Sequence, residues 1–180
     1  VVHSQVVKQA DVVMLLYLME KEFSPEIREA NYNYYESKTV HDSSLSAAMH
    51  AIVSSRLGKI EQAYDYFLDS LKIDCGTKMN SSNSGIHAAS LGGNWQAVVN
   101  GFAGVRVSEL GSLSINPHLP EKWRSLNFSI TYREFLLDVQ IKKGYCKLIR
   151  KDTSDSDLLL LSGNTEYKIS ENEAIEIEFT

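Results

Sequence analysis

The chain has 180 residues, of which 43% are hydrophobic and 23% charged, a composition typical of folded globular domains and unlike that of disordered chains. Its 18 Lys and Arg residues against 23 Asp and Glu residues give a net charge of −5, which argues against nucleic acid and anionic membrane surfaces as partners. No apolar run reaches the length that a membrane-spanning helix requires.

The chain begins without Met, in residues that already lead into a helical pattern, and we therefore expect it to be the C-terminal piece of a longer protein. Nothing at its start resembles a signal peptide. The two cysteines, Cys75 and Cys146, lie far apart and in no metal-ligand spacing. We expect free thiols, no metal site and a cytoplasmic location.

Apolar residues at helical spacing dominate the first part of the chain and predict helices over residues 5–19, 25–35, 47–57 and 59–74. Ser24-Pro25-Glu26 marks the second helix start, because it supplies a capping hydroxyl, a proline at the first helical position and an acid in the first turn. Gly58 separates the third helix from the fourth, so these two are predicted to form an α-hairpin. Lys8 and Gln9 lie off the apolar stripe of the first helix and could face either water or a cavity.

Four polar residues crowd the start of the helix over residues 47–57, namely His41, Asp42, Ser43 and Ser44. A helix start needs only one Ser or Asp as its cap. The unpartnered N–H groups and the positive dipole end of a helix start favour anions. The surplus of hydroxyl, carboxylate and imidazole groups therefore suggests a binding site.

A second polar helix start lies in residues 85–102, where His87 follows a glycine turn and Gly92 and Gly93 come one turn later. Glycines there would let a ligand approach the backbone, which suggests an anion or polyol site. The alternative is a simple helix entry with His87 as a capping or packing residue. The rest of the segment is predicted to be a buried amphipathic run with Trp95, Val98, Val99 and Phe102 at spacings of three and four.

The pattern changes near residue 104 to short runs that alternate apolar and polar residues. These runs predict strands over residues 126–132, 135–142, 147–149, 158–161, 167–169 and 175–179. The expected structure is an antiparallel β-unit in which one sheet packs on another. Its charged residues fall on alternate positions and are predicted to face solvent, and it contains no recognisable catalytic constellation.

The chain also carries a series of longer motifs in one order: Val7-Lys8-Gln9-Ala10-Asp11-Val12, Ala30-Asn31-Tyr32, Tyr34-Tyr35-Glu36, His41-Asp-Ser-Ser-Leu-Ser46, Gly85-Ile-His-Ala-Ala-Ser-Leu-Gly-Gly93, Trp95-Gln96, Gly101-Phe-Ala-Gly-Val-Arg106 and Leu113-Ser-Ile-Asn-Pro-His-Leu-Pro-Glu-Lys-Trp123. Together these motifs resemble the C-terminal part of the disaccharide phosphorylases of glycoside hydrolase family 65, a group that includes maltose, trehalose and kojibiose phosphorylases. The resemblance runs from residue 1 to about residue 145.

The resemblance implies an α+β fold in which residues 1–105 hold the last helices of a catalytic α/α barrel and residues 106–180 form a C-terminal antiparallel, sandwich-like β-domain. It implies reversible phosphorolysis of an α-glucoside with inversion, which gives β-glucose 1-phosphate and a free sugar. No cofactor is implied, because inorganic phosphate is the co-substrate and the nucleophile. The implied partners are the disaccharide, phosphate, the upstream remainder of the same polypeptide and a second copy in a homodimer.

The resemblance assigns binding residues but no catalytic residue to this chain. The general acid of the family is a Glu in an upstream motif of the Gly-Pro-Asp-Glu-Tyr type, which this sequence lacks, and the context of Glu36 does not match it. Lys8 and Gln9 match a pair that contacts substrate in the glucose-binding region. Ser43, Ser44 and His87 match phosphate-binding positions, with Gly92 and Gly93 beside them.

Two other functions stay open at this point. The first is a trehalase-like hydrolase of the same family, in which water replaces phosphate; it predicts non-donor residues in place of Ser43 and Ser44. The second is a non-enzymatic helical interaction module, because the hairpin over residues 47–73 resembles a tetratricopeptide unit, although no such repeat recurs along the chain. We expect the 180-residue chain alone to be inactive, since its general acid is absent.

Overall fold

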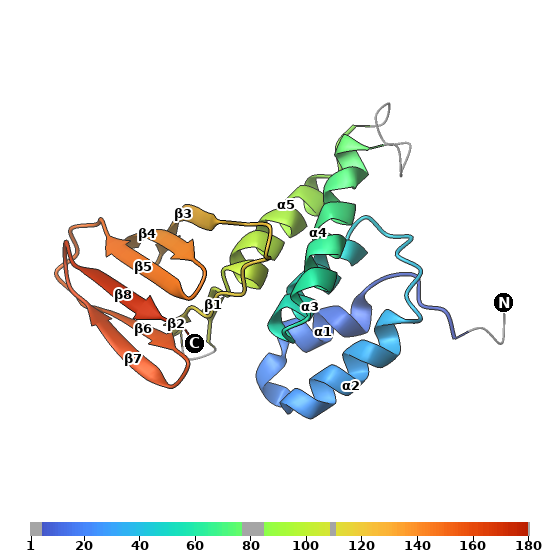
Figure 1. Ribbon diagram of the computed structural model, residues 1–180, viewed down its shortest axis with the longest axis horizontal. Helices are drawn as coiled ribbons and strands as arrows, with labels where there is room; N and C mark the ends of the chain where they lie inside the picture. Colours follow the sequence, from blue (N-terminus) through green and yellow to red (C-terminus); the bar gives the residue numbers. More distant parts are fainter. Residues whose placement is uncertain (1–4, 77–84, 109–110, 180) are drawn as a thin grey trace. The chain divides into compact units, whose positions relative to one another are not determined.

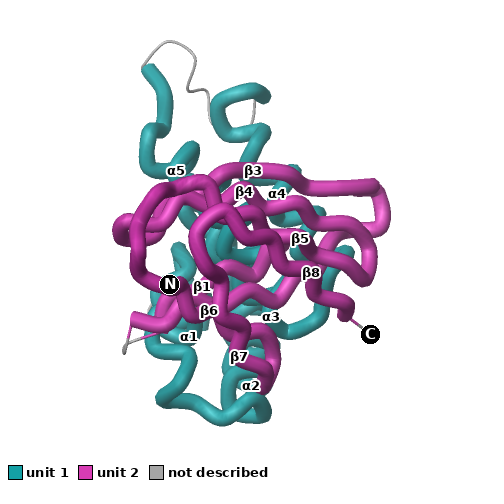
Figure 2. Tube along the Cα trace, turned by 90° about the vertical axis from the view of Figure 1, so that its left-hand side faces the viewer, with its two compact units in different colours: residues 1–101 teal, residues 102–180 magenta. Residues whose placement is uncertain are grey.

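The computed structural model describes residues 5–76, 85–108 and 111–179 (Figure 1). The chain divides into two compact units, Val1–Gly101 and Phe102–Thr180, which carry different colours in Figure 2. The first unit is helical and the second is built from strands, so the α+β class expected from the sequence is confirmed.

Among its described residues, unit 1 contains five α-helices and a 3₁₀ turn: α1 (Asp11–Leu18), the turn (Glu20–Glu22), α2 (Pro25–Glu36), α3 (Ser46–Arg56), α4 (Ile60–Cys75) and α5 (Ala88–Gln96). A π-helical segment (Ala97–Phe102) follows α5 and ends at the first residue of unit 2. The predicted start of α2 is confirmed, because the Ser24 hydroxyl accepts a hydrogen bond from the Ile27 N–H and Pro25 is the first helical residue. Gly58 turns the chain between α3 and α4 with a positive φ of 75°, as the predicted hairpin requires.

The first helix is shorter than the predicted span of residues 5–19, since α1 begins only at Asp11. The reason lies in the backbone of Val7, which forms a parallel β-bridge with Thr39 instead of a helical turn. The apolar residues before Asp11 have helical spacing, but the backbone of Val7 forms its hydrogen bonds with residues 38 and 40 and not within a helix. The spacing therefore predicted a helix that begins too early.

Helix α3 is the centre of unit 1 and contacts α1, α2, α4 and α5 (Figure 1). Small side chains such as Ala48 and Ala51 let its neighbours approach closely, and both are fully buried. One carboxylate fastens three helical segments around it. Glu20 accepts two hydrogen bonds from the guanidinium of Arg56 on α3, at 3.0 and 2.7 Å, and also pairs with Arg28 on α2.

The run after α5 departs from the predicted pattern. Ala97, Val99 and Phe102 are buried, but Trp95 is 56% exposed, so the expectation that Trp95 packs in the core is wrong. The π-helical segment Ala97–Phe102 explains the error, because its i→i+5 bonds change the rotation per residue where α5 ends. Residues three or four apart in the sequence therefore do not lie on the same side of the helix where α5 passes into the π-helical segment.

The described residues of unit 2 form two four-stranded sheets. One has the order β1-β2-β6-β7 and the other β3-β4-β5-β8, with β1 (Arg106–Val107), β2 (Leu113–Ser114), β3 (Ser125–Tyr132), β4 (Phe135–Lys142), β5 (Tyr145–Arg150), β6 (Leu158–Ser162), β7 (Thr165–Ile169) and β8 (Ala174–Glu178). All described pairs are antiparallel except β2 with β6, which is parallel and departs from the antiparallel unit that was predicted. Alternate residues such as Leu137, Val139 and Ile141 on β4 are buried, as the period of two predicts.

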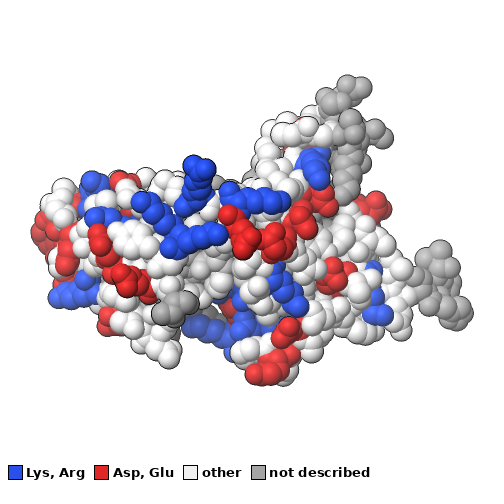
Figure 3. All heavy atoms as spheres, viewed as in Figure 1, with Lys and Arg blue, Asp and Glu red and all other residues white. Residues whose placement is uncertain are grey.

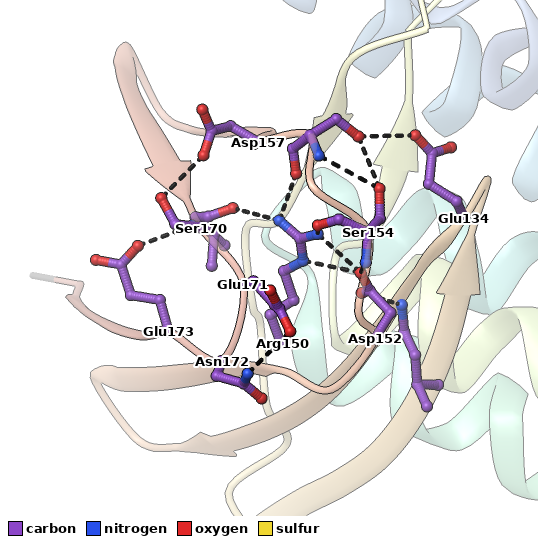
Figure 4. Close-up of polar contacts among 12 residues, drawn as sticks. Glu134, Arg150, Asp152, Ser154, Asp157, Ser170, Glu171, Asn172 and Glu173 are labelled. Carbon is purple, nitrogen blue, oxygen red and sulfur yellow. Dashed lines mark hydrogen bonds and ion pairs between the residues drawn. The ribbon is translucent and has the colours of Figure 1, made fainter.

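The prediction that the charged residues of the strands face solvent is wrong at Arg150, which is 1% exposed. Its guanidinium donates to Asp152 Oδ1 from Nε at 3.0 Å and from Nη2 at 2.8 Å, and to the carbonyls of Ser154, Ser156 and Ile169 (Figure 4). It also lies 4.7 Å from the centre of the Phe135 ring. Hydrogen bonds from Arg150 hold the pKa of Asp152 at about 2, so this internal ion pair keeps its charges at neutral pH.

Both cysteines are free, as expected. Cys146 is fully buried on β5, where burial raises the pKa of its thiol to about 12, whereas Cys75 is exposed at the end of α4. A buried thiol with a raised pKa is unreactive.

Candidate functional site

The two groups of residues that the sequence singled out early in the chain meet at the Val7–Thr39 bridge. The Val7 N–H donates to the Lys38 carbonyl at 2.9 Å, and the Val40 N–H donates to the Val7 carbonyl at 3.0 Å. Because the bridge is parallel, both segments leave it in the same direction. Lys8 and Gln9 directly follow the bridge on one segment, and the His41–Ser44 segment begins two residues after it on the other.

Lys8 and Gln9 themselves are exposed in a bend before α1. The Gln9 side chain donates to Asp11 Oδ1 at 3.1 Å, which holds it at the start of that helix. Of the two orientations left open by the sequence, the described residues therefore show the open one rather than a closed cavity.

The segment between α2 and α3 has an unusual backbone. His41 has a φ of 52°, in the left-handed region that costs a residue with a side chain on the order of 1 kcal/mol. Ser43 then turns the chain, since its hydroxyl accepts the Leu45 N–H at 3.4 Å and its carbonyl accepts the Ser46 N–H at 3.1 Å. With its acceptor side used in this way, the Ser43 hydroxyl keeps its proton to donate to a ligand.

A pocket of about 330 Å³ opens at this segment. Its described lining residues are Val40, His41, Asp42, Ser43, Ala47, Tyr66, Asp69 and Ile73. Ala47 belongs to the first turn of α3, so the positive end of that helix dipole lies at the pocket wall. Hydroxyl, carboxylate, imidazole and phenol groups together suit a ligand that is rich in hydroxyls.

A chain of hydrogen bonds runs behind the pocket wall. The Tyr66 hydroxyl donates to Glu36 Oε1 at 2.7 Å, and the Gln62 amide donates to the same oxygen at 3.0 Å. The Tyr66 oxygen also lies 3.3 Å from His41 Nε2, and His41 Nδ1 lies 3.0 Å from the buried Ser46 hydroxyl. Residues of α2, α3 and α4 are thereby linked through His41, the residue with the left-handed backbone that lines the pocket.

A second imidazole packs against this chain. His50 on α3 is fully buried, with its ring 4.5 Å from that of His41 and 5.1 Å from that of Tyr66. Its Nδ1 lies 2.9 Å from the Ser46 carbonyl, which can only accept, so Nδ1 carries the proton. Burial lowers the pKa of His50 to about 4, and the ring is therefore neutral at neutral pH.

His87 stands at the start of α5 and binds one carboxylate twice. Its N–H contacts both oxygens of Asp74, at 3.1 and 3.0 Å, and its Nδ1 lies 2.8 Å from Asp74 Oδ1. The carboxylate fixes the ring and leaves Nε2 as the nitrogen that can serve a ligand. Asp74 follows Ile73, which lines the pocket, so the end of α4 links His87 to the pocket wall.

The two glycines of α5 have different surroundings. A Cβ at Gly93 would lie 2.9 Å from the Cβ of Ala48 on α3, so Gly93 allows two helices to approach each other. A Cβ at Gly92 would meet nothing within 4 Å, and Gly92 is exposed. Gly93 thus has a packing reason that the sequence alone did not reveal.

Of the residues that the sequence assigned to phosphate, the pocket gathers Ser43. Ser44, His87, Gly92 and Gly93 are not among its described lining residues, although Ser44 is the next residue and His87 is tied to α4. The sequence reasoning missed Tyr66, Asp69 and Asp74. Tyr66 and Asp69 lie three residues apart on α4 and therefore share one face of that helix, which was the signal for these two. Asp74 gave no local signal, because its partner is 13 residues away.

Other features bear on the kind of site. Within the described ranges, no three His, Cys, Asp or Glu side chains are close enough to hold a metal ion. None of the described helices combines the length and the apolar character needed to span a bilayer. On the face drawn in Figure 3, Lys and Arg side chains lie next to Asp and Glu side chains, so the face carries both signs of charge.

Comparison with known proteins connects this geometry to a family. Residues 1–96 match the model of the glycosyl hydrolase family 65 central catalytic domain, and residues 106–160 match the model of the family 65 C-terminal domain. A kojibiose phosphorylase from Halothermothrix orenii is 54% identical over 139 residues, which cover 77% of this chain and 18% of the relative. An α,α-trehalose phosphorylase from Geobacillus stearothermophilus is 35% identical over 177 residues, 97% of this chain and 22% of the relative.

A solved structure agrees with these relatives. It belongs to a protein from the human microbiome that is provisionally assigned as a kojibiose phosphorylase, and it matches 97% of this chain with a TM-score of 0.87 and 31% identity. The match covers 22% of that protein, so this chain spans about a fifth of the length of its relatives. Family models match both of its units, and its helices and sheets match a solved relative. The chain therefore belongs to glycoside hydrolase family 65.

Proposed function

We propose that this chain is the C-terminal part of a disaccharide phosphorylase that cleaves an α-glucoside with inorganic phosphate and inverts the anomeric configuration. Relatives named kojibiose, trehalose and maltose phosphorylase match it over most of its length. In the proposed enzyme the helices of unit 1 complete a catalytic α/α barrel, and a glutamate outside this chain is the general acid. This chain contributes binding residues.

The observation that carries the proposal is the Val7–Thr39 bridge beside the pocket. Lys8 and Gln9, a cation and an amide, directly follow the bridge on one segment, and the segment with Ser43 and Ser44 begins shortly after it on the other. An ammonium and an amide suit sugar hydroxyls, while hydroxyls at the positive end of α3 suit a phosphate. A helical interaction module would have no use for this arrangement.

The chemistry needs one new bond and one broken bond. A phosphate oxygen attacks the anomeric carbon from one side, and the bond from that carbon to the glycosidic oxygen breaks on the other side. The general acid gives its proton to the departing sugar oxygen, and β-glucose 1-phosphate remains. Because phosphate supplies the nucleophile, the enzyme needs donors that hold a dianion in line with the bond. We propose Ser43, Ser44 and His87 for that task, with Gly92 and Gly93 nearby and with Asp74 orienting the imidazole.

Kojibiose is the disaccharide that we propose as the substrate. Four relatives named kojibiose phosphorylase are 54%, 46%, 42% and 44% identical to this chain, whereas the relative named maltose phosphorylase is 36% identical. We also propose that the enzyme is a cytoplasmic homodimer and that it uses neither a metal nor an organic cofactor, since phosphate is its only other reactant.

The test uses the full-length polypeptide that carries residues 1–180. Incubation with kojibiose and inorganic phosphate should yield β-glucose 1-phosphate and glucose in equal amounts, whereas the 180-residue chain alone should yield neither. Release of glucose without phosphate consumption would instead establish the trehalase-like hydrolase. No reaction with kojibiose, trehalose or maltose would overturn the proposal.

Two substitutions test the residue roles. Ser43→Ala and His87→Ala should each raise the KM for phosphate by about tenfold or more, the size expected for a lost hydrogen bond to a charged ligand, and change the KM for the glucoside much less. Lys8→Met should show the opposite preference, since we place Lys8 at the sugar. Equal KM values for phosphate in the wild type and in both variants would contradict the assignment of the phosphate site.

A further inference from the structure

We infer that Glu36, Tyr66 and His41 form a positioning relay that holds the Ser43–Ser44 loop in the conformation required for phosphate. The inference rests on the proposed function and deepens it, because it names residues that act on the phosphate loop without touching phosphate. Its basis is the direction of each hydrogen bond behind the pocket wall.

The directions follow from counting protons. A tyrosine hydroxyl has one proton, and the Tyr66 proton goes to Glu36 Oε1 at 2.7 Å. The Tyr66 oxygen therefore accepts from His41 Nε2, which lies 3.3 Å away, so Nε2 carries a proton. In the Nε2–H tautomer that we infer for His41, Nδ1 is an acceptor and the Ser46 hydroxyl at 3.0 Å is its donor.

The result is a one-way chain from Ser46 through His41 and Tyr66 to Glu36, in which every proton has one acceptor. It joins three helices, since Glu36 ends α2, Ser46 begins α3 and Tyr66 lies in α4. Gln62, also on α4, donates to the same Glu36 oxygen at 3.0 Å and fixes the far end. A chain of this kind sets both the tautomer and the rotation of the His41 ring.

The orientation of His41 matters because its backbone is strained. A residue with a side chain keeps a φ of 52° only where its surroundings hold it there, and the hydrogen bonds at the two ends of the His41 ring are among the contacts that do so. Asp42 and Ser43 follow directly and line the pocket. Loss of either contact should let residues 41–44 relax and move the serine hydroxyls away from the phosphate position.

The kinetic test compares two tyrosines of α4 in the full-length enzyme. Tyr66→Phe removes the hydroxyl and keeps the ring, and it should raise the KM for inorganic phosphate about tenfold while the KM for kojibiose changes less than about twofold. Tyr64→Phe is the matched control, since Tyr64 packs near Phe67 outside the pocket, and it should change neither KM. Glu36→Gln retains a carbonyl that can accept from Tyr66 and should restore most of the phosphate affinity that Glu36→Ala loses.

A spectroscopic test uses the 180-residue chain itself. Nitrogen-15 spectra of the imidazoles should show the Nε2–H tautomer for His41 and the Nδ1–H tautomer for His50, and Tyr66→Phe should alter only His41. A wild-type His41 in the Nδ1–H form would overturn the relay.

The two inferences fail in different ways. If Ser43→Ala raises the phosphate KM and Tyr66→Phe does not, or if Tyr66→Phe raises both KM values equally, the relay is wrong and the phosphorylase stands. If the wild-type enzyme shows no phosphorolysis, the proposed function is wrong, and the imidazole spectra still decide whether the relay exists.

Discussion

The two units solve the problem of buried polar groups in opposite ways. Among the described residues, unit 1 buries neutral polar groups, among them the hydroxyls of Ser46 and Ser54 and the imidazole of His50, whereas unit 2 also buries a charge, the guanidinium of Arg150. Ser46 and His50 contact His41, which lines the pocket, and a hydroxyl such as that of Ser46 can both donate and accept. The guanidinium only donates, in fixed directions, and it organises the loop after β5. The difference separates a region suited to binding from a region suited to holding a shape.

The largest expected effect tests the charged side of this comparison. Arg150→Ala should lower the free energy of unfolding of unit 2 by about 3–5 kcal/mol, the usual cost of removing one partner of a buried ion pair. Asp152 and the carbonyls of Ser154, Ser156 and Ile169 would lose their donor. Urea unfolding followed by the fluorescence of Trp123, in a Trp95→Phe background, measures it.

Lys151→Ala is the control for that experiment, because Lys151 is exposed and next to Arg150 in the chain. It should leave the urea midpoint almost unchanged. If the two variants lose the same stability, the guanidinium does not organise this part of unit 2, and the contrast between the units disappears.

The next effect concerns the buried neutral groups of unit 1 and is measured as the pH dependence of stability. The pKa of His50 is about 4 in the fold against an ordinary value of 6.5, so the unfolded chain binds a proton first as the pH falls. The contribution of neutral His50 to the free energy of unfolding has its full value above about pH 6.5. It declines as the pH drops to about 4, by about 3 kcal/mol in total. Far-UV circular dichroism during urea unfolding at several pH values measures the loss.

Unit 2 should behave differently over the same range. The pKa of Asp152 is lowered from 3.8 to about 2, so the stability that its charge gives is lost only as the pH falls below about 4. His50→Asn, which keeps a donor for the Ser46 carbonyl but does not titrate, should abolish the loss between pH 6.5 and 4. An unchanged pH dependence in that variant would assign the effect to other groups.

The smallest effect distinguishes packing from ligand contact in α5. Gly93→Ala should cost about 1–3 kcal/mol, because its methyl group would press on Ala48. Gly92→Ala should instead stabilise unit 1 by about 0.5–1 kcal/mol, since the position is open and alanine favours a helix. Thermal unfolding measures both. A rise in the phosphate KM of the full-length Gly92→Ala enzyme would show that this glycine approaches the ligand, as the family resemblance implies.

Local features of the fold were predictable because their causes are local. Ser24 and Pro25 mark the start of α2 within three residues, and the alternation over residues 135–142 gives β4 with its observed bounds. The parallel pairing of β2 with β6 was not predictable, since the partners Leu113 and Leu160 are far apart in the sequence and nothing near either one specifies the other.

Arg150 shows a different kind of error. Cys146, Leu148 and Arg150 share one face of β5, and this period already places Arg150 inside. The sequence interpretation nevertheless placed the charged residues of this unit in solvent, because Arg is rarely buried without a partner. The carbonyls that accept from Arg150 cannot be recognised from the sequence. The same holds for the pocket, where Ser43 was predicted from its helix start but Tyr66 and Glu36 become a pair only when α2 and α4 pack together.

The β-bridge at Val7 has a consequence for how the site opens. Two backbone hydrogen bonds fasten Val7, which precedes Lys8 and Gln9, to the segment before His41, and one of them belongs to the Val40 amide. The exchange rate of that single amide proton with solvent deuterium therefore reports how often the two segments part, without any unfolding of the helices around them. A ligand that spans both segments should slow this exchange, and one that contacts a single segment should leave it unchanged.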